Sequence, residues 1–583
     1  MSSVVGVSPA PKVGWPEKMK AFRLGPSGSL VAGLLVLTGL LIAGPLALLL
    51  LASLKPAGTM PWDPAALTIR NFVAVFSSPA TLRLLINTAT YSAGSICFGG
   101  VLALALSWLI ERTDLPLRRL VYVGQAVTLG LPPMITALGW TLWLSPRIGL
   151  ANTLLRAISG SDASEGPLNG YSLWGMVFVT GLGICPSMFY MLSPLVGRID
   201  ASLEEAAQTA GARTPTIWRR ILLPLMLPGL LSVLMYYAVA VSQTFEVPLA
   251  LGLPSQTLVL STRVFLLTQP GGGPPDYGLA SAYALITLAL GLLLMTVFIR
   301  TSRHSERFQV VTGKGYRPKR AQLGVWTVPA TAFVLGYLLV AVLAPLGLLL
   351  WASLLPFYQA PSGQALQSLS LAAYGSVLHN QRVVTAAINT VVLLAGTATL
   401  VMGLSLLIAW ACVRIRLRSV RLLEGMAFTP LAIPHVLMAL GVLLLYARTP
   451  IYGTVAIIML GQVTAYLAYG NRTLIASLMQ VKRELEESAA VHGAGGWQTI
   501  RAIVLPLLKP AMANGWVWVA THSMRDFTFP LMLGTTGNLV VAALIWNFWT
   551  TPNLPAAAAL SILLAASLGL VAGIARALLS PRR

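Results

Sequence analysis

Twelve apolar runs, each long enough to cross a bilayer as a helix, divide this sequence and limit what it can fold into. A helix needs about 20 apolar residues to span the hydrocarbon core. The runs do not alternate between apolar and polar residues as barrel strands do, and helices satisfy their own backbone groups in lipid. We therefore predict an all-α integral membrane protein with about 12 transmembrane helices. The predicted spans lie near residues 30–53, 84–110, 120–144, 171–197, 223–251, 278–299, 327–354, 384–411, 424–447, 453–476, 507–534 and 555–575.

Composition excludes several other classes of protein. Only 10% of the residues are charged, against about 25% in a soluble domain. The net charge of +22 could suggest nucleic acid, but the basic residues flank apolar runs and form no patch interleaved with aromatic residues, so no nucleic-acid partner is expected. The three cysteines show no metal-ligand or disulfide spacing. We expect no cofactor, no permanent metal site and no enzymatic activity in this chain itself.

Lys and Arg are distributed unequally between alternate connecting segments. With the N-terminus inside, the inner segments hold 28 of these residues and the outer segments hold 8. Cytoplasmic loops carry this excess in membrane proteins. Both termini are therefore predicted to be cytoplasmic, and the expected location is a bacterial inner membrane, with lipid around the spans.

A polar segment occurs twice between the apolar runs, at inner loops of the predicted topology. Its copies begin at residues 204 and 486, and each matched position lies 282 residues later. The segment has good helix formers and small side chains that permit close approach to another surface. A glycine then stands where the helix should end with positive φ. The residues of this candidate docking surface are Glu204, Glu205, Ala206, Ala207 and Gly211 in the first copy, and Glu486, Glu487, Ser488, Ala489 and Gly493 in the second.

The order Glu-Ala-Ala, three residues, Gly, nine residues, Ile-x-Leu-Pro resembles the cytoplasmic signature loop of permease subunits of binding-protein-dependent ABC importers. The first copy ends at Pro224 and the second at Pro506, and Ser488 replaces the first Ala in the second copy. In that family the loop is a coupling helix that fits a cleft of the ATP-hydrolysing subunit. The resemblance implies two parallel six-helix repeats of the type I importer permease fold, with a separate dimeric ATP-binding subunit as partner.

The repeat extends through both halves of the chain. Ile86-Asn87-Thr88 recurs as Ile388-Asn389-Thr390, Trp108 as Trp410, and Gly139 as Gly441. An even number of spans per half makes the repeats parallel. The expected divisions are a basic tail (1–29), a first permease domain (30–300, coupling loop 198–222), a cytoplasmic linker (301–326) and a second permease domain (327–583, coupling loop 480–506).

Charged residues inside spans are costly and are by default candidates for function. Glu246 is predicted late in the fifth span, and Arg525 and Asp526 occupy the corresponding region of the second half. Aligning Pro248 with Pro530 pairs Phe245 with Phe527. These three charged residues either line the translocation path near an outer gate or form an external solvated or ion-paired cluster, in which Arg525 is a candidate partner for Glu246.

The fused layout is similar to single-chain permeases of the ferric-iron importer class. Ferric iron is therefore the first expected cargo, and thiamine, polyamine or aminophosphonate importers of the same layout remain alternatives. A periplasmic or lipid-anchored solute-binding protein is the second expected partner. An ion-coupled secondary transporter is a remote alternative, because it has no reason to repeat a polar docking helix; a membrane scaffold or sensor would need an output domain that the sequence does not offer.

Overall fold

The computed structural model describes residues 27–197, 201–269, 274–305, 320–551 and 553–579. Throughout these ranges the regular secondary structure is helical, apart from an isolated β-bridge between Thr113 and Ala321. This confirms the predicted all-α class. The basic tail lies outside the described residues up to residue 26, and so does most of the linker, residues 306–319.

The first half contains these elements: α1 (Ser27–Thr38), η1 (Gly39–Ala43), α2 (Gly44–Ser53), α3 (Arg70–Ser77), α4 (Pro79–Arg112), α5 (Arg118–Gly130), α6 (Pro133–Leu144), α7 (Leu150–Ser159), α8 (Leu173–Gly197), α9 (Ala201–Thr209), α10 (Thr214–Ile217), η2 (Trp218–Leu222), α11 (Leu223–Ser242), η3 (Pro248–Gly252), α12 (Leu260–Thr268) and α13 (Tyr277–Ser305).

The second half contains these elements: η5 (Gly324–Trp326), α14 (Thr327–Leu338), η6 (Leu339–Leu343), α15 (Ala344–Ser353), α16 (Gly363–Gln367), α17 (Ala372–Leu378), α18 (Gln381–Arg414), α19 (Arg418–Phe428), η7 (Thr429–Ala432), α20 (His435–Tyr446), α21 (Val455–Leu478), α22 (Glu484–Val491), α23 (Gly496–Thr499), η8 (Ile500–Val504), α24 (Leu505–Arg525), α25 (Thr528–Leu533), α26 (Val541–Thr550) and α27 (Leu554–Leu579).

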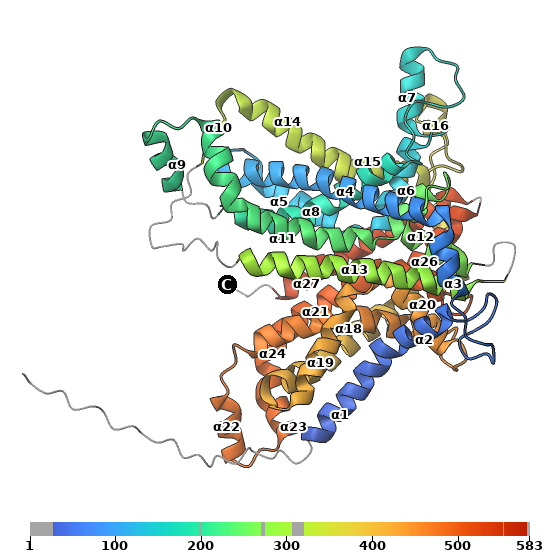
Figure 1. The fold of residues 1–583 in the computed structure, drawn as a ribbon. Coiled ribbons are helices and arrows are strands. Elements are labelled where there is room, and N and C mark those ends of the chain that lie inside the picture. Colours follow the sequence, from blue (N-terminus) through green and yellow to red (C-terminus); the bar gives the residue numbers. More distant parts are fainter. Residues whose placement is uncertain (1–26, 198–200, 270–273, 306–319, 552, 580–583) are drawn as a thin grey trace, which may run out of the picture.

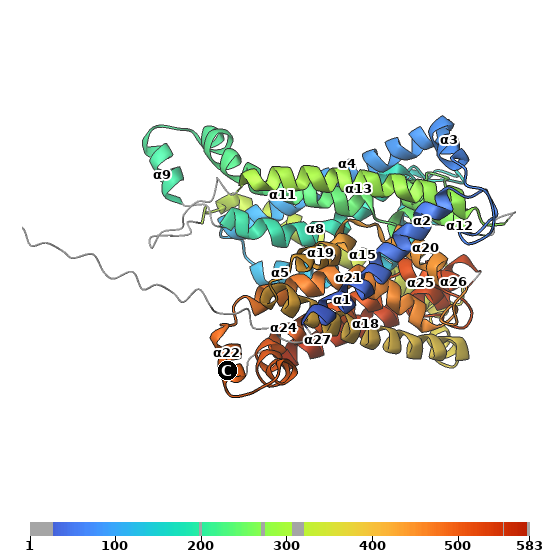
Figure 2. The same cartoon turned by 60° about the horizontal axis from the view of Figure 1, so that its bottom comes forward.

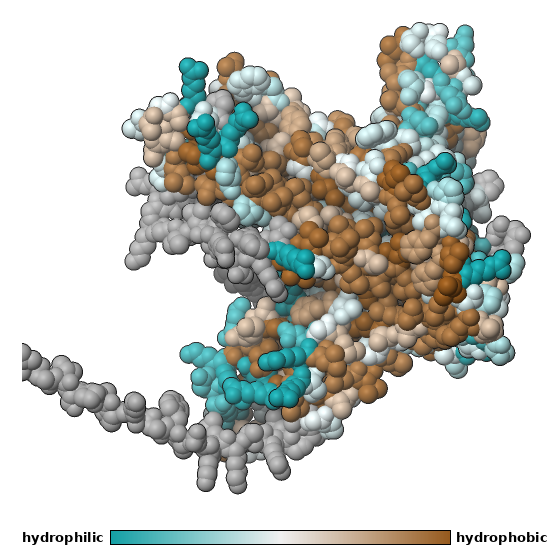
Figure 3. Space-filling model, viewed as in Figure 1, coloured by the Kyte–Doolittle hydropathy of each residue, from teal (hydrophilic) through white to brown (hydrophobic). Residues whose placement is uncertain are grey.

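Most predicted spans correspond to long apolar helices. Within the described ranges, nine helices are long and apolar enough to cross a membrane, or eleven if each of two bent pairs counts as one span. The remaining prediction, 453–476, corresponds to α21, which is long but less apolar because it carries the fully buried Gln462 and Asn471. Figure 3 shows apolar surface over the middle of the molecule and polar surface at its two ends.

Two predicted spans, 120–144 and 424–447, are each divided by a sharp break. The axes of α5 and α6 differ by 98°, and those of the α19–η7 segment and α20 differ by 114°. The breaks fall at Leu131 and Ile433, which have extended backbone (ψ 136° and 121°) and each precede a proline. A proline disfavours helical backbone in the residue before it, and this accounts for the position of both breaks.

The first helix of each half packs on the other half. α2 lies against α20, and α15 lies against α6; Figure 2 shows α1 and α2 crossing the second half. Glycines allow these crossings: a Cβ on Gly139 would lie 2.6 Å from the carbonyl oxygen of Pro345, and one on Gly441 would lie 2.8 Å from Cβ of Pro45. The two halves are therefore interlocked along their length.

The fifth and eleventh spans end earlier than predicted. α11 stops at Ser242 and α24 at Arg525, and each is followed by a short break and a second short helix. Asn87 Nδ2 donates to the carbonyl oxygen of Leu258 at 2.9 Å, and Asn389 Nδ2 donates to that of Leu539 at 2.9 Å. These carbonyl oxygens lie in the loops just before α12 and α26, where no helical hydrogen bond is available to them. The repeated Asn therefore supplies the donor that each of them needs.

Candidate functional site

The two copies of the signature segment form short helices at one end of the molecule. α9 and α22 lie beyond the ends of α8 and α21, one in each half, and are well separated from each other (Figure 1). Each helix ends at the glycine predicted to need positive φ, Gly211 at 81° and Gly493 at 82°. The N–H groups of Ala212 and Ala494 then donate to carbonyl oxygens five residues back, at 2.9 and 3.0 Å. This is the helix-ending pattern that glycine at this position permits.

The second Glu of each copy faces outward. Glu205, Ala206, Glu487 and Ser488 are exposed, and Glu487 forms an ion pair with Arg483 at 3.2 Å on the surface of its own helix. Equivalent leucines lie beside them: Leu203 is 38% exposed and Leu485 is 47% exposed.

The first Glu of each copy binds its own half of the chain instead. Glu204 Oε1 lies 2.5 Å from Arg112 Nη2, and Glu486 Oε1 lies 2.6 Å from Arg414 Nε. The arginines are the last residues of α4 and α18, and their side chains are only 6% and 11% exposed. We call each pair a clamp, because it ties the short helix α9 or α22 to a membrane-spanning helix.

Reasoning from the sequence missed both arginines of the clamps. The available signal was their position: each follows the repeated tryptophan, Trp108 or Trp410, by four residues. In the first half, Arg112 also accepts a hydrogen bond at its carbonyl oxygen from Ala321 N at 2.8 Å. The end of the linker is thereby attached next to the first clamp.

A second constellation lies where the halves meet, toward the end opposite α9 and α22. The rings of Phe245 and Phe527 stack at 6.4 Å between centroids, and both side chains are 1% exposed. Next to them, Thr528 Oγ1 donates to Glu246 Oε1 at 3.2 Å. Each pair joins equivalent positions of the repeat, 282 residues apart. Contacts between equivalent residues place this cluster close to the axis that relates the two halves.

Glu246, Arg525 and Asp526 do not have the arrangement expected from the sequence. Glu246 lies beyond the end of α11 and the break at residues 243–245, in the helical residues directly before η3, and Asp526 lies just after the end of α24. Arg525 Nη1 donates to the carbonyl oxygen of Leu129 at 2.6 Å. A Glu246–Arg525 ion pair does not occur among the described residues, so Arg525 joins α24 to the first half through a backbone carbonyl instead.

Asp526 is held in a buried network that the first half lacks. Gln462 Nε2 donates to Asp526 Oδ2 at 3.0 Å, and the backbone N–H of Thr528 donates to Oδ1 at 3.0 Å. In the first half, the equivalent place is occupied by hydroxyl groups: the Tyr91 hydroxyl pairs with Thr180 at 2.7 Å and with Thr244 at 2.8 Å. The two halves therefore contribute equivalent aromatic rings, Phe245 and Phe527. The second half has the carboxylate of Asp526 where the first half has the uncharged Thr244.

No group of three or more His, Cys, Asp or Glu side chains in the described ranges is placed to hold a metal ion. Glu246 accepts a hydrogen bond from Thr528, and Asp526 accepts one from Gln462.

Comparisons with known proteins all find membrane components of transport systems. The family model described as "Binding-protein-dependent transport system inner membrane component" matches residues 95–302 and 402–583, well over half of the chain. The chain is 26% identical over 429 residues to a putative ferric transport system permease protein FbpB 1 of Haemophilus influenzae, covering 73% of this chain and 66% of that one. It is 26% identical over 456 residues to the ferric transport system permease protein FbpB of Actinobacillus pleuropneumoniae, covering 78% and 64%. The chain thus spans just under two thirds of the length of these relatives.

Other similar proteins match a smaller part of this chain. The sulfate transport system permease protein CysT of Escherichia coli is 31% identical over 228 residues, which is 36% of this chain and 81% of that one. Among solved structures, a bacterial ABC transporter involved in the import of the polysaccharide alginate is 20% identical, with a TM-score of 0.38, over 49% of this chain and 96% of that one.

Proposed function

The chain belongs to the family of binding-protein-dependent transport system inner membrane components, and from this membership we propose that it forms the whole channel of an ATP-driven importer. Its relatives are transport permeases and not enzymes. The family match in both halves supports two fused permease domains, 30–300 and 327–583, joined by the linker. The bilateral clamps are the observation that carries the proposal, because they connect both coupling helices to the transmembrane helices.

A separate dimeric ATPase is proposed to bind the surfaces around α9 and α22. Glu205, Ala206, Glu487 and Ser488 would contact it directly, whereas Glu204 and Glu486 act through the clamps. Closure of the ATPase would move both coupling helices toward each other. The clamps would pass this movement to α4 and α18, and the constriction at Phe245 and Phe527 would open.

The present arrangement corresponds to a channel closed on the outer side. The halves meet at the aromatic pair and diverge toward α9 and α22 (Figures 1 and 2). With both termini cytoplasmic, as the Lys and Arg distribution favours, the divergent end faces the cytoplasm. A solute-binding protein would then deliver cargo at the opposite end, where α3, α7, α16 and α26 lie.

Ferric iron is the proposed cargo. The relatives named for ferric transport match over 73% and 78% of this chain. Relatives named for spermidine/putrescine and for 2-aminoethylphosphonate transport match over 34% and 27%. Polyamine, aminophosphonate or thiamine transport is the alternative.

The experiment that tests function uses the complete complex in proteoliposomes. The co-encoded binding protein is first screened by thermal shift with Fe³⁺, spermidine, thiamine and 2-aminoethylphosphonate, and the stabilising ligand is then used as labelled cargo. Uptake should require ATP on the side of α9 and α22. Glu205→Lys and Glu487→Lys should abolish uptake and reduce ATPase co-purification, whereas Gln364→Lys, an exposed change on α16 far from both helices, should leave co-purification intact. Uptake driven by an ion gradient without ATP would contradict the proposal.

A further inference from the structure

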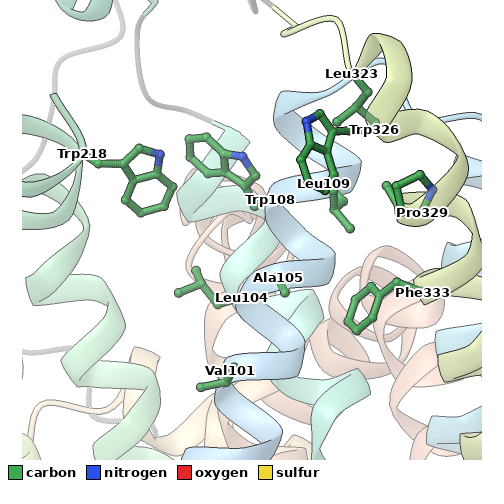
Figure 4. A pocket seen from close by; sticks show the side chains of 11 residues that line it. Val101, Leu104, Ala105, Trp108, Leu109, Trp218, Leu323, Trp326, Pro329 and Phe333 are labelled. Atoms are coloured by element: carbon green, nitrogen blue, oxygen red, sulfur yellow. The ribbon is translucent and has the colours of Figure 1, made fainter. Parts of the chain in front are cut away.

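An apolar pocket of about 690 Å³ adjoins the first clamp. Its walls come from α4, from α14 of the other half and from the start of η2, with Trp108, Trp218, Trp326 and Phe333 among its lining residues. Figure 4 shows the Trp108 ring between Trp218 on one side and Trp326 on the other, with Phe333 farther along α14. No charged residue lines it within the described chain. The pocket is open to the outer surface of the helices, and Trp326 is 72% exposed.

A second apolar pocket, of about 630 Å³, occupies the equivalent place in the second half. Its walls come from α18, from α1 of the other half and from the start of η8, with Trp410, Leu34 and Ile500 among its lining residues. Trp410 is the repeat counterpart of Trp108, and Ile500 is that of Trp218, 282 residues later. The pockets are therefore a pair created by the exchange of first helices between the halves.

The surroundings of the pair indicate the chemistry of an occupant. Both pockets lie on the membrane-facing side of spanning helices, where Val101 is 64% exposed and Leu37 is 44% exposed. An exposed arginine follows directly at equivalent positions, Arg219 after Trp218 and Arg501 after Ile500. These arginines lie at the cytosolic ends of their helices in the predicted topology. Basic residues there attract the anionic headgroups of the cytoplasmic leaflet.

We propose that each pocket binds an acyl chain of an anionic phospholipid, with the lipid phosphate at Arg219 in the first half and at Arg501 in the second. Apolar walls suit the chain, and an exposed arginine one residue after a lining residue is within the same helical turn to bind the phosphate. Tryptophan at the boundary of the hydrocarbon region places an apolar ring and a polar N–H at the same depth as the headgroup.

The first lipid site adjoins the first clamp through Trp108, whose ring lies under the guanidinium of Arg112. The rings of Trp108 and Trp218 are 4.4 Å apart. Arg112, which binds Glu204, has its Cζ atom 5.6 Å from the centre of the Trp108 ring. A lipid chain packed on Trp108 would thus support the side chain that orients the coupling helix α9.

The test uses the full chain with its ATPase, reconstituted in phosphatidylethanolamine nanodiscs that contain phosphatidylglycerol with a diazirine on one acyl chain. After illumination, labelled residues are mapped by mass spectrometry. We expect labelling concentrated at residues 101–109 and 326–333 for the first site, and at 30–37 and 407–410 for the second. Ala330→Trp fills the first pocket and should reduce its labelling at least fivefold while leaving the second site unchanged. Val328→Trp is the matched control, because Val328 is 76% exposed on the same helix and does not line the pocket.

The headgroup is tested separately with phosphatidylcholine carrying the same photoreactive chain. We expect it to label both sites at least fivefold less than phosphatidylglycerol does, and Arg219→Gln to remove this preference at the first site only. Equal labelling by the two lipids would overturn the headgroup assignment. Uniform labelling along the exposed helix faces, or cross-links from the pockets to another part of the same chain, would overturn the lipid sites themselves.

Discussion

Glu246 and Thr528 occupy the same position in the two halves and hydrogen-bond to each other at 3.2 Å. Two equivalent residues can touch only close to the axis that relates their halves. Phe245 and Phe527 are also equivalent residues, and their rings stack on each other close to the same axis. Contacts between equivalent residues of the two halves therefore mark where we place the closed part of the proposed channel.

Cysteines at these positions should report on the state of the channel. In a background where Cys97, Cys185 and Cys412 are replaced, Glu246→Cys with Thr528→Cys should form a disulfide rapidly in the absence of ATP. The cross-link should block uptake, because it holds the constriction closed. A non-hydrolysable ATP analogue should slow its formation. The rate of cross-linking, followed on gels, checks this; a rate unaffected by nucleotide would contradict opening at this level.

Breaking a clamp should uncouple ATP hydrolysis by the ATPase from transport, without preventing folding of the membrane spans. Arg112→Gln leaves Glu204 without its cation, and loss of a partner by a buried charged group costs about 1–3 kcal/mol. We expect uptake to fall at least tenfold, with ATP hydrolysis by the complex becoming less dependent on the loaded binding protein. Arg414→Gln should behave alike. The exchange Arg112→Glu with Glu204→Arg should recover part of the uptake; equal loss in the exchange variant and in the single variant would argue against a clamp.

The glycines that end the coupling helices should not tolerate a branched side chain. Gly493→Val forces a β-branched residue into the left-handed region, at a cost of about 1–2 kcal/mol. ATPase co-purification and uptake should fall together. Gly495→Ala is the control, because Gly495 has φ −69° and a Cβ there would lie 3.9 Å from its nearest neighbour. An intact complex in Gly493→Val would show that this ending is not needed for docking.

The repeated Asn should be important for stability. Asn389→Ala leaves the carbonyl oxygen of Leu539 without its 2.9 Å donor, and about 1–3 kcal/mol should be lost. The thermal midpoint of the purified chain should decrease, and Asn87→Ala should produce a similar decrease. Thr385→Ala on the same helix is the control, since its hydroxyl bonds only within that helix, to Gln381. An unchanged midpoint in both Asn variants would remove the explanation for the repeated motif.

The spans were predictable because apolar length has a direct physical meaning in a bilayer. The breaks were less predictable. The break after Ser242 contains Thr244, whose hydroxyl pairs with the Tyr91 hydroxyl, 153 residues away in the sequence. A hydropathy pattern contains no information about such distant partners, so it predicts one continuous helix through Glu246, whereas the structure has a break just before this residue.

The candidate site shows the same limit. The signature segment identified α9 and α22 and their terminal glycines, because helix propensity and positive φ are local properties. It did not separate the two glutamates of each copy. Glu204 turns inward and Glu205 outward only because Arg112 ends α4 within reach, and that proximity arises from tertiary packing.

The exchanged first helices also affect the order in which the chain can fold. α2 finds its partner α20 only after nearly four hundred further residues have been synthesised, and α6 must wait about two hundred residues for α15. The first half therefore cannot complete its packing while it emerges from the ribosome. α2 and α6 stay without these partners until the second half arrives, and a truncated product would leave the Gly139 and Gly441 crossings unmade.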